Sequence, residues 1–201
     1  MSFIQSNLNA RLNISNSQHA NAYKQLRQAR LLTAKRPFLA RGITVKRCEA
    51  CLLAKQYCMC EWLKPFNGEL WFDVVLLMHR DEILKPTNSG RLMAEAFPEQ
   101  CMAFEWSRLE PPQALLSLIN DSHRQCAIVY PARNDRQAVD FNLMPQANSN
   151  ASMMALNLQA SHSLNSKRPT LLFLDGTWRQ AARMFNHSHW LSHLPFFALD
   201  S

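Results

Sequence analysis

The sequence has no apolar run of eighteen residues, so it contains no candidate membrane span. Residues 1–15 are polar and lack the apolar stretch of a secretory signal, and we therefore expect a cytoplasmic protein. The chain has neither G-x-G-x-x-G nor G-x-x-x-x-G-K-[ST], which argues against a dinucleotide-binding turn and a P-loop. Its 201 residues suffice for one domain with a sizeable core and a small appendage.

Acidic residues are nearly absent from the first sixty positions. Glu49 is the one acid there, against ten Lys or Arg, so this part has a net charge of +9 and the rest of the chain −2. Such a surface favours nucleic acid as a partner, because basic side chains displace the counterions of phosphates. The alternative is an unspecialised solvated basic face. The residues that we predict to contact RNA are Lys24, Arg27, Arg30, Lys35, Arg36, Arg41, Lys46, Arg47, Arg80 and Lys85.

We expect three parts along the chain. Residues 1–43 form a loose tail and a helix from about His19 to Ala34, residues 44–68 form a small cysteine-rich unit, and residues 69–201 form the main domain. The helix is more basic than amphipathic. We therefore expect it to dock weakly and to direct its charges outward.

Four of the six cysteines fall within thirteen residues. Cys48, Cys51, Cys58 and Cys60 have the spacing C-x2-C-x6-C-x-C, which in a cytosolic chain indicates a metal site before a disulfide. Four thiolates suit a closed tetrahedral structural zinc site, so we predict a small zinc knuckle with four cysteine ligands. The C-x-C half is less usual in zinc sites, and an iron–sulfur cluster or a reduced cluster without metal stays open.

Strand and helix patterns alternate along the main domain. This alternation predicts an α/β fold with a mostly parallel sheet. The predicted strands are Leu70–Met78, Cys101–Trp106, Gln125–Tyr130, a strand through Leu171–Leu174, and Leu194–Leu199. The predicted helices are Arg91–Ala96, Pro111–Asn120 and Trp178–Phe185.

Polar side chains follow three of these strands where each strand ends. Asp175, Thr177 and Trp178 follow one strand, the turn 87–91 follows another, and Tyr130 ends a third. The carboxyl ends of parallel strands meet at one edge of the sheet, where such folds bind ligands, so we expect these residues to line one cleft. Thr177 is also a plausible helix N-cap. In the alternative interpretation, Asp175 only caps the helix and Trp178 belongs to the core.

Five motifs occur in an order that resembles the DTW-domain family over about residues 45–199. They are the C-x2-C…C-x-C cluster, H-R-x-E at 79–82, K-P-T-N-S-G-R-L at 85–92, Y-P at 130–131 and D-G-T-W at 175–178. The family consists of tRNA-uridine aminocarboxypropyltransferases, distant members of the SPOUT superfamily. The resemblance implies that S-adenosylmethionine gives its 3-amino-3-carboxypropyl group to N3 of a tRNA uridine and leaves as methylthioadenosine. It also implies a SPOUT-like fold with a C-terminal knot.

The resemblance assigns roles to residues of this chain. Asp175 matches the aspartate of the family and is the expected general base, since the imide N–H of uridine must lose its proton before it attacks. Two departures are Ser89, where threonine is usual, and the end at Ser201, where family members continue; we expect an incomplete C-terminus of the catalytic domain. The alternatives are a zinc-knuckle RNA-binding module without catalysis and a SPOUT-type RNA methyltransferase. The residues expected to bind S-adenosylmethionine are Thr87, Asn88, Ser89, Gly90, Arg91, Tyr130, Pro131, Thr177 and Trp178.

Overall fold

The computed structural model describes residues 21–34, 44–66, 68, 70–131 and 167–197. Five strands form one sheet in the order β2-β1-β4-β3-β5, and every pair of neighbours is parallel. The predicted α/β class with a parallel sheet is therefore confirmed. The strands are β1 Asp73–Met78, β2 Cys101–Glu105, β3 Arg124–Val129, β4 Arg168–Asp175 and β5 Phe196–Phe197.

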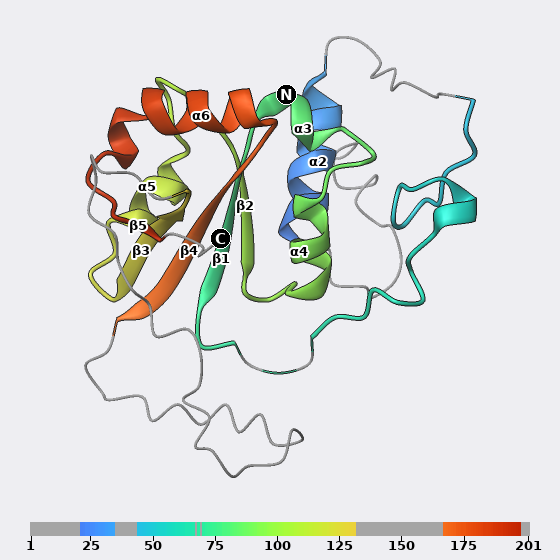
Figure 1. The fold of residues 1–201 in the computed structure, drawn as a ribbon, viewed down its shortest axis with the longest axis horizontal. Helices are drawn as coiled ribbons and strands as arrows, with labels where there is room; N and C mark the ends of the chain where they lie inside the picture. Colours follow the sequence, from blue (N-terminus) through green and yellow to red (C-terminus); the bar gives the residue numbers. More distant parts are fainter. Residues whose placement is uncertain (1–20, 35–43, 67, 69, 132–166, 198–201) are drawn as a thin grey trace, which may run out of the picture.

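The helices cover both faces of this sheet (Figure 1). They are α2 Ala22–Thr33, α3 Arg80–Ile83, α4 Gly90–Ala96, α5 Gln113–Ile119 and α6 Trp178–His187, with the 3-10 turns η1 Lys55–Tyr57 and η2 His189–Leu191. The short α3 was not predicted from the sequence, because four residues are too few to show helical periodicity. None of the described helices has both the length and the apolar composition needed to cross a bilayer.

The two faces of the sheet have separate cores, and β1 supplies both. Val75 and Leu77 pack with α5 and α6 on one face, whereas Val74, Leu76 and Met78 pack with α2, α3 and α4 on the other. All five side chains are almost fully buried. Alternate residues of a strand point to opposite faces, so an uninterrupted apolar run is what a central strand covered on both sides requires.

Helix α2 is firmly attached to the second of these cores. Tyr23 is 1% exposed, and its hydroxyl donates a hydrogen bond to the carbonyl of Ile83 at 3.0 Å. Lys24 forms an ion pair with Glu95 at 3.0 Å. The expectation that this helix docks weakly with its charges outward is therefore wrong, because one buried tyrosine anchors it and two of its cations face carboxylates. The second of those pairs joins Arg30 to Glu105 at 3.9 Å.

Some predictions fall on residues outside the described ranges. Among the predicted RNA contacts these are Lys35, Arg36 and Arg41. The C-terminal knot of the SPOUT resemblance also stays a prediction, since residues 198–201 lie outside the described part of the chain.

Candidate active site

The candidate site lies where β1 and β4 end side by side. Met78 and Asp175, the last residues of the two strands, are opposite each other in the parallel pair. From β1 the chain continues to β2 at one edge of the sheet. From β4 it continues through α6 to β5 at the opposite edge. Such a reversal of strand order leaves a crevice outside the strand ends, which is the usual ligand site of open α/β sheets.

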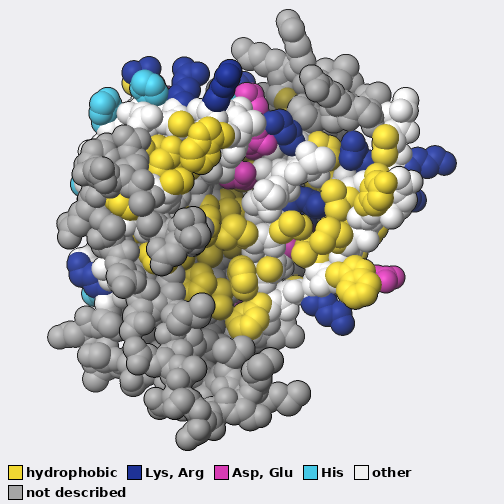
Figure 2. All heavy atoms as spheres, in the orientation of Figure 1, with side chains coloured by type: hydrophobic (Ala, Val, Ile, Leu, Met, Phe, Trp, Pro, Cys, Tyr) yellow, Lys and Arg dark blue, Asp and Glu magenta, His cyan; other side chains and the backbone are white. Residues whose placement is uncertain are grey.

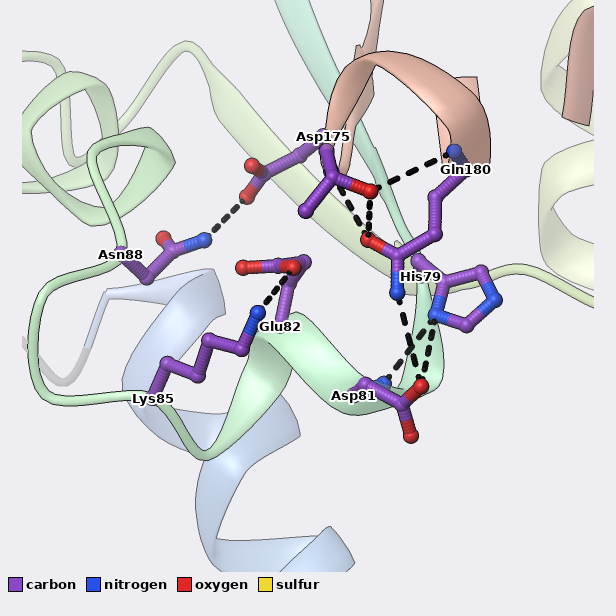
Figure 3. Close-up of polar contacts among 8 residues, drawn as sticks. His79, Asp81, Glu82, Lys85, Asn88, Asp175 and Gln180 are labelled. Carbon is purple, nitrogen blue, oxygen red and sulfur yellow. Dashed lines mark hydrogen bonds and ion pairs between the residues drawn. The ribbon is translucent and has the colours of Figure 1, made fainter. Parts of the chain in front are cut away.

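Asp175 is held by the turn between α3 and α4. The amide Nδ2 of Asn88 donates a hydrogen bond to Oδ2 of Asp175 at 2.7 Å (Figure 3). Oδ1 of Asn88 accepts one from the backbone N–H of Arg91 at 3.0 Å. With both ends of its amide engaged, Asn88 has a fixed orientation, and so has the carboxylate that it contacts. The predicted convergence of Asp175 and the 87–91 turn is therefore confirmed for these residues.

Gly90 allows this close approach. A Cβ atom added at position 90 would overlap Oδ2 of Asp175 and press on its Cγ at 3.0 Å. The glycine is thus required by the space that the carboxylate occupies.

A second carboxylate shares the site. Glu82 is 7% exposed and pairs with Lys85 at 2.5 Å, and Figure 3 shows its carboxylate and that of Asp175 turned toward one space. Burial raises the pKa of Asp175, the charge of Glu82 raises it further, and the Asn88 hydrogen bond and Lys85 lower it. The site thus holds a carboxylate with a stronger affinity for protons than an exposed one. Glu82 was not predicted to belong to it; the H-R-x-E motif was the available signal.

Thr177 begins α6, as predicted. Its Oγ1 accepts a hydrogen bond from the N–H of Gln180 at 3.4 Å, and Oε1 of Gln180 accepts one from the N–H of Thr177 at 2.8 Å. This capping box fixes the turn that follows Asp175. Gln180 also donates to Asp81 of α3 at 3.4 Å, which links the two strand ends.

Aromatic rings form one wall near the start of α6. The rings of Tyr130 and Trp178 are nearly parallel with centroids 6.1 Å apart, and Tyr130 stacks on Phe185 at 4.1 Å. Trp178 is 69% exposed, so the alternative in which it belongs to the core is wrong. Its exposed ring offers a stacking surface to a planar ligand.

The remaining predicted ligand residues differ in exposure. Thr87, Ser89 and Pro131 are exposed. Arg91 is 3% exposed, and its guanidinium donates hydrogen bonds to the backbone carbonyls of Cys51 and Asn88. The structure thus gives Arg91 protein partners that the sequence did not predict.

The four clustered cysteines have the geometry of a metal centre. Their Sγ atoms all lie within 4.8 Å of one another, with Cys48 to Cys60 at 3.6 Å and Cys51 to Cys58 at 3.7 Å. Tetrahedral zinc with Zn–S bonds of about 2.3 Å places sulfurs about 3.8 Å apart, so the residues fit this ion. The backbone of the cluster closes as a tight turn, with the N–H of Leu52 donating to the carbonyl of Cys48 at 2.9 Å.

A hollow of about 570 Å³ lies between the cysteine cluster and helices α2 and α4, away from Asp175. Cys51, Cys60, Lys24 and Glu95 are among the residues that line it. It is separate from the candidate active site.

We compared the sequence with models of known protein families. The model of the DTW domain matches residues 45–201, which include the cysteine cluster, the 85–92 turn and the strand end at Asp175. The chain belongs to the DTW domain family. Membership of the DTW domain family is consistent with a role in tRNA modification, and four cysteines at metal-binding distance are compatible with a structural zinc ion. No solved structure matches this chain.

Proposed function

We propose that this DTW-domain protein is a tRNA-uridine aminocarboxypropyltransferase. It transfers the 3-amino-3-carboxypropyl group of S-adenosylmethionine to N3 of a uridine in tRNA and releases methylthioadenosine. The observation that supports this most is the half-buried Asp175 carboxylate, fixed by Asn88 at the switch point of the sheet within the D-G-T-W motif.

The chemistry assigns one proton transfer to Asp175. Its carboxylate takes the proton from N3 of uracil, and the N3 lone pair attacks the γ-carbon of the methionine part of S-adenosylmethionine. The bond between that carbon and sulfur breaks, and its electron pair neutralises the sulfonium, so methylthioadenosine leaves uncharged. A raised pKa suits this role, because a base whose pKa lies closer to neutrality accepts the proton more readily.

The other residues position the two substrates. Trp178 and Tyr130 offer stacking surfaces for adenine or uracil, and the exposed hydroxyls of Thr87 and Ser89 lie on the turn beside Asp175. We assign Arg80, which is exposed at the first residue of α3, to contact with an RNA phosphate. The selectivity for the γ-carbon over the methyl carbon comes from the orientation of the sulfonium.

An isotope experiment tests the proposal. Unmodified tRNA is incubated with S-adenosylmethionine labelled in the carboxyl group or, separately, in the methyl group. We expect the carboxyl label in the RNA and the methyl label in methylthioadenosine. Methyl label in the RNA would instead identify a methyltransferase, and neither label in RNA that the protein binds would identify a binding module.

A matched pair of variants ties the activity to the site. Asp175→Asn is expected to lower the transfer rate about 10²- to 10⁴-fold, the usual contribution of a general base. Glu110→Gln makes the same change of carboxylate to amide at an exposed position before α5 and is expected to keep full activity. Equal rates for the two variants would exclude Asp175 as the base.

A further inference from the structure

The cysteine segment, residues 44–66, exposes more large apolar side chains than any other part of the described chain. Tyr57 is 66% exposed and Trp62 is 82% exposed. Val45, Met59 and Phe66 of the same segment are also exposed, so five of the nine exposed large hydrophobic residues belong to it. Only four further residues of this kind, Leu31, Leu32, Leu109 and Trp178, are spread over the rest of the described residues.

Both aromatic rings are attached to the cysteine cluster. Tyr57 directly precedes Cys58, and Trp62 follows Cys60 by two residues. The N–H of Trp62 donates a hydrogen bond to the carbonyl of Met59 at 3.0 Å. A metal held by these two cysteines would fix the backbone from which both rings project.

Three lysines belong to the same segment as these rings. Lys46, Lys55 and Lys64 are exposed, and their ammonium groups form no ion pair with another described residue. Figure 2 shows hydrophobic side chains interspersed with Lys and Arg on this side of the molecule, where Figure 1 places the segment. Lysine is depleted at protein–protein interfaces, whereas aromatic rings with free cations beside them are the usual surface for unpaired nucleotides.

We infer that the cysteine segment is a stacking platform for an unpaired stretch of the tRNA, with Tyr57 and Trp62 each receiving a base and Lys46, Lys55 and Lys64 facing the backbone phosphates. The inference rests on the proposed function for the identity of the RNA. It adds a second contact region, because these two rings are not among the residues of the Asp175 site.

Affinity measurements at several salt concentrations test the platform. Trp62→Ala is expected to weaken tRNA binding roughly 5- to 150-fold, the effect of losing one base–aromatic stack, without changing the dependence on salt. Trp62→Phe restores most of the affinity because it keeps a π-face. The double change Lys55→Ala and Lys64→Ala instead makes the negative slope of log K against log salt shallower by about 1–2. Leu109→Ala, at a residue 85% exposed, is the control for removal of a surface hydrophobic side chain.

Two results would overturn the inference. One is an unchanged affinity of Trp62→Ala and Tyr57→Ala when both keep the metal content and circular dichroism spectrum of the unchanged protein. The other is self-association in sedimentation experiments that Trp62→Ala abolishes, which would make the surface a contact between copies of this chain. If the protein transfers the group and Trp62→Ala binds tRNA with unaltered affinity, the platform alone is rejected. If tRNA binding depends on Trp62 but no group is transferred, the proposed function alone is rejected.

Discussion

The guanidinium of Arg91 donates a hydrogen bond through Nη1 to the backbone carbonyl of Cys51, forty positions earlier in the chain. The same side chain donates through Nε to the carbonyl of Asn88 at 3.1 Å, and Asn88 in turn holds Asp175. A continuous chain of hydrogen bonds therefore connects the cysteine cluster with the candidate base. A substitution that disrupts the cysteine cluster is therefore expected to change the position of the Asp175 carboxylate, and the reverse.

Replacing Arg91 tests this connection. Arg91→Met keeps much of the volume but leaves two carbonyls without their donor, so we expect the free energy of unfolding to fall by about 2–4 kcal/mol. Urea denaturation measures this loss, and Arg108→Met, at an exposed arginine before α5, serves as the control. If the two variants were equally stable, the buried hydrogen bonds of Arg91 would have no net effect on folding.

Metal content is the second test. We expect about one zinc ion per chain in the purified protein, and its loss when Cys48 and Cys51 are both changed to serine. Burial raises the pKa of Cys101 to about 12 and that of Cys126 to about 11, so these two thiols should resist alkylation in the folded protein. After chelation, iodoacetamide should modify the accessible thiols Cys48, Cys58 and Cys60 first, and all six cysteines only after unfolding, because Cys51, Cys101 and Cys126 are buried. Elemental analysis that finds no metal would exclude a metal centre.

The pH dependence of transfer is expected to report Asp175. Because burial raises its pKa above the ordinary 3.8, kcat/KM should fall with acid at a higher pH than an exposed aspartate would give. Glu82→Gln removes a charge that raises this pKa and should move the acidic limb to lower pH. Asn88→Ala removes a hydrogen bond that lowers it and should move the limb to higher pH. Shifts in the same direction for both variants would contradict the assignment.

The same raised pKa has a defined effect on stability. The folded state binds this proton more tightly than the unfolded state, so the unfolding free energy due to Asp175 falls as pH rises from the unfolded pKa to the folded pKa. Asp175→Asn removes this loss. In urea denaturation we therefore expect the variant to be at least as stable as the unchanged protein at neutral pH, although its transfer rate is strongly reduced.

Gly90→Ala tests the geometry of the site with a single methyl group. The methyl would displace Oδ2 of Asp175, and a displacement of about 1 Å at a catalytic group costs on the order of 10²-fold in rate. Ala is a better helix former than Gly, so this first residue of α4 should not lose helicity. Ala94→Gly, at a buried position of the same helix, is expected to lower stability instead. Full activity of Gly90→Ala would show that the carboxylate has room to move.

The strand ends were predictable because their signal is local. A buried parallel strand is an apolar run, and the polar residues that end it, such as Asp175 and Thr177, follow at once in the sequence. Topology then brings separate strand ends to one edge. The contact between Asp175 and the 87–91 turn thus followed from two local patterns and one general rule.

The contacts of α2 and of Arg91 were not predictable in the same way. In α2 a single buried side chain, Tyr23, decides the docking, and the basic pattern around it gives no periodic signal. An arginine is seldom buried without a partner, and the partner of Arg91 is a backbone carbonyl, which no side-chain pattern reveals. Both interactions depend on pairs far apart in the sequence.

The position of β4 sets the order in which the molecule can be completed. β4 pairs with β1 on one side and with β3 on the other, although it is made after both of them. A nascent chain that has not yet produced residues 168–175 therefore has two separate halves, β1 with β2 and β3 alone. The strand that joins these halves is the strand that ends in Asp175. The protein acquires its continuous sheet and its candidate base in one late step of synthesis, so partly made chains should contain neither.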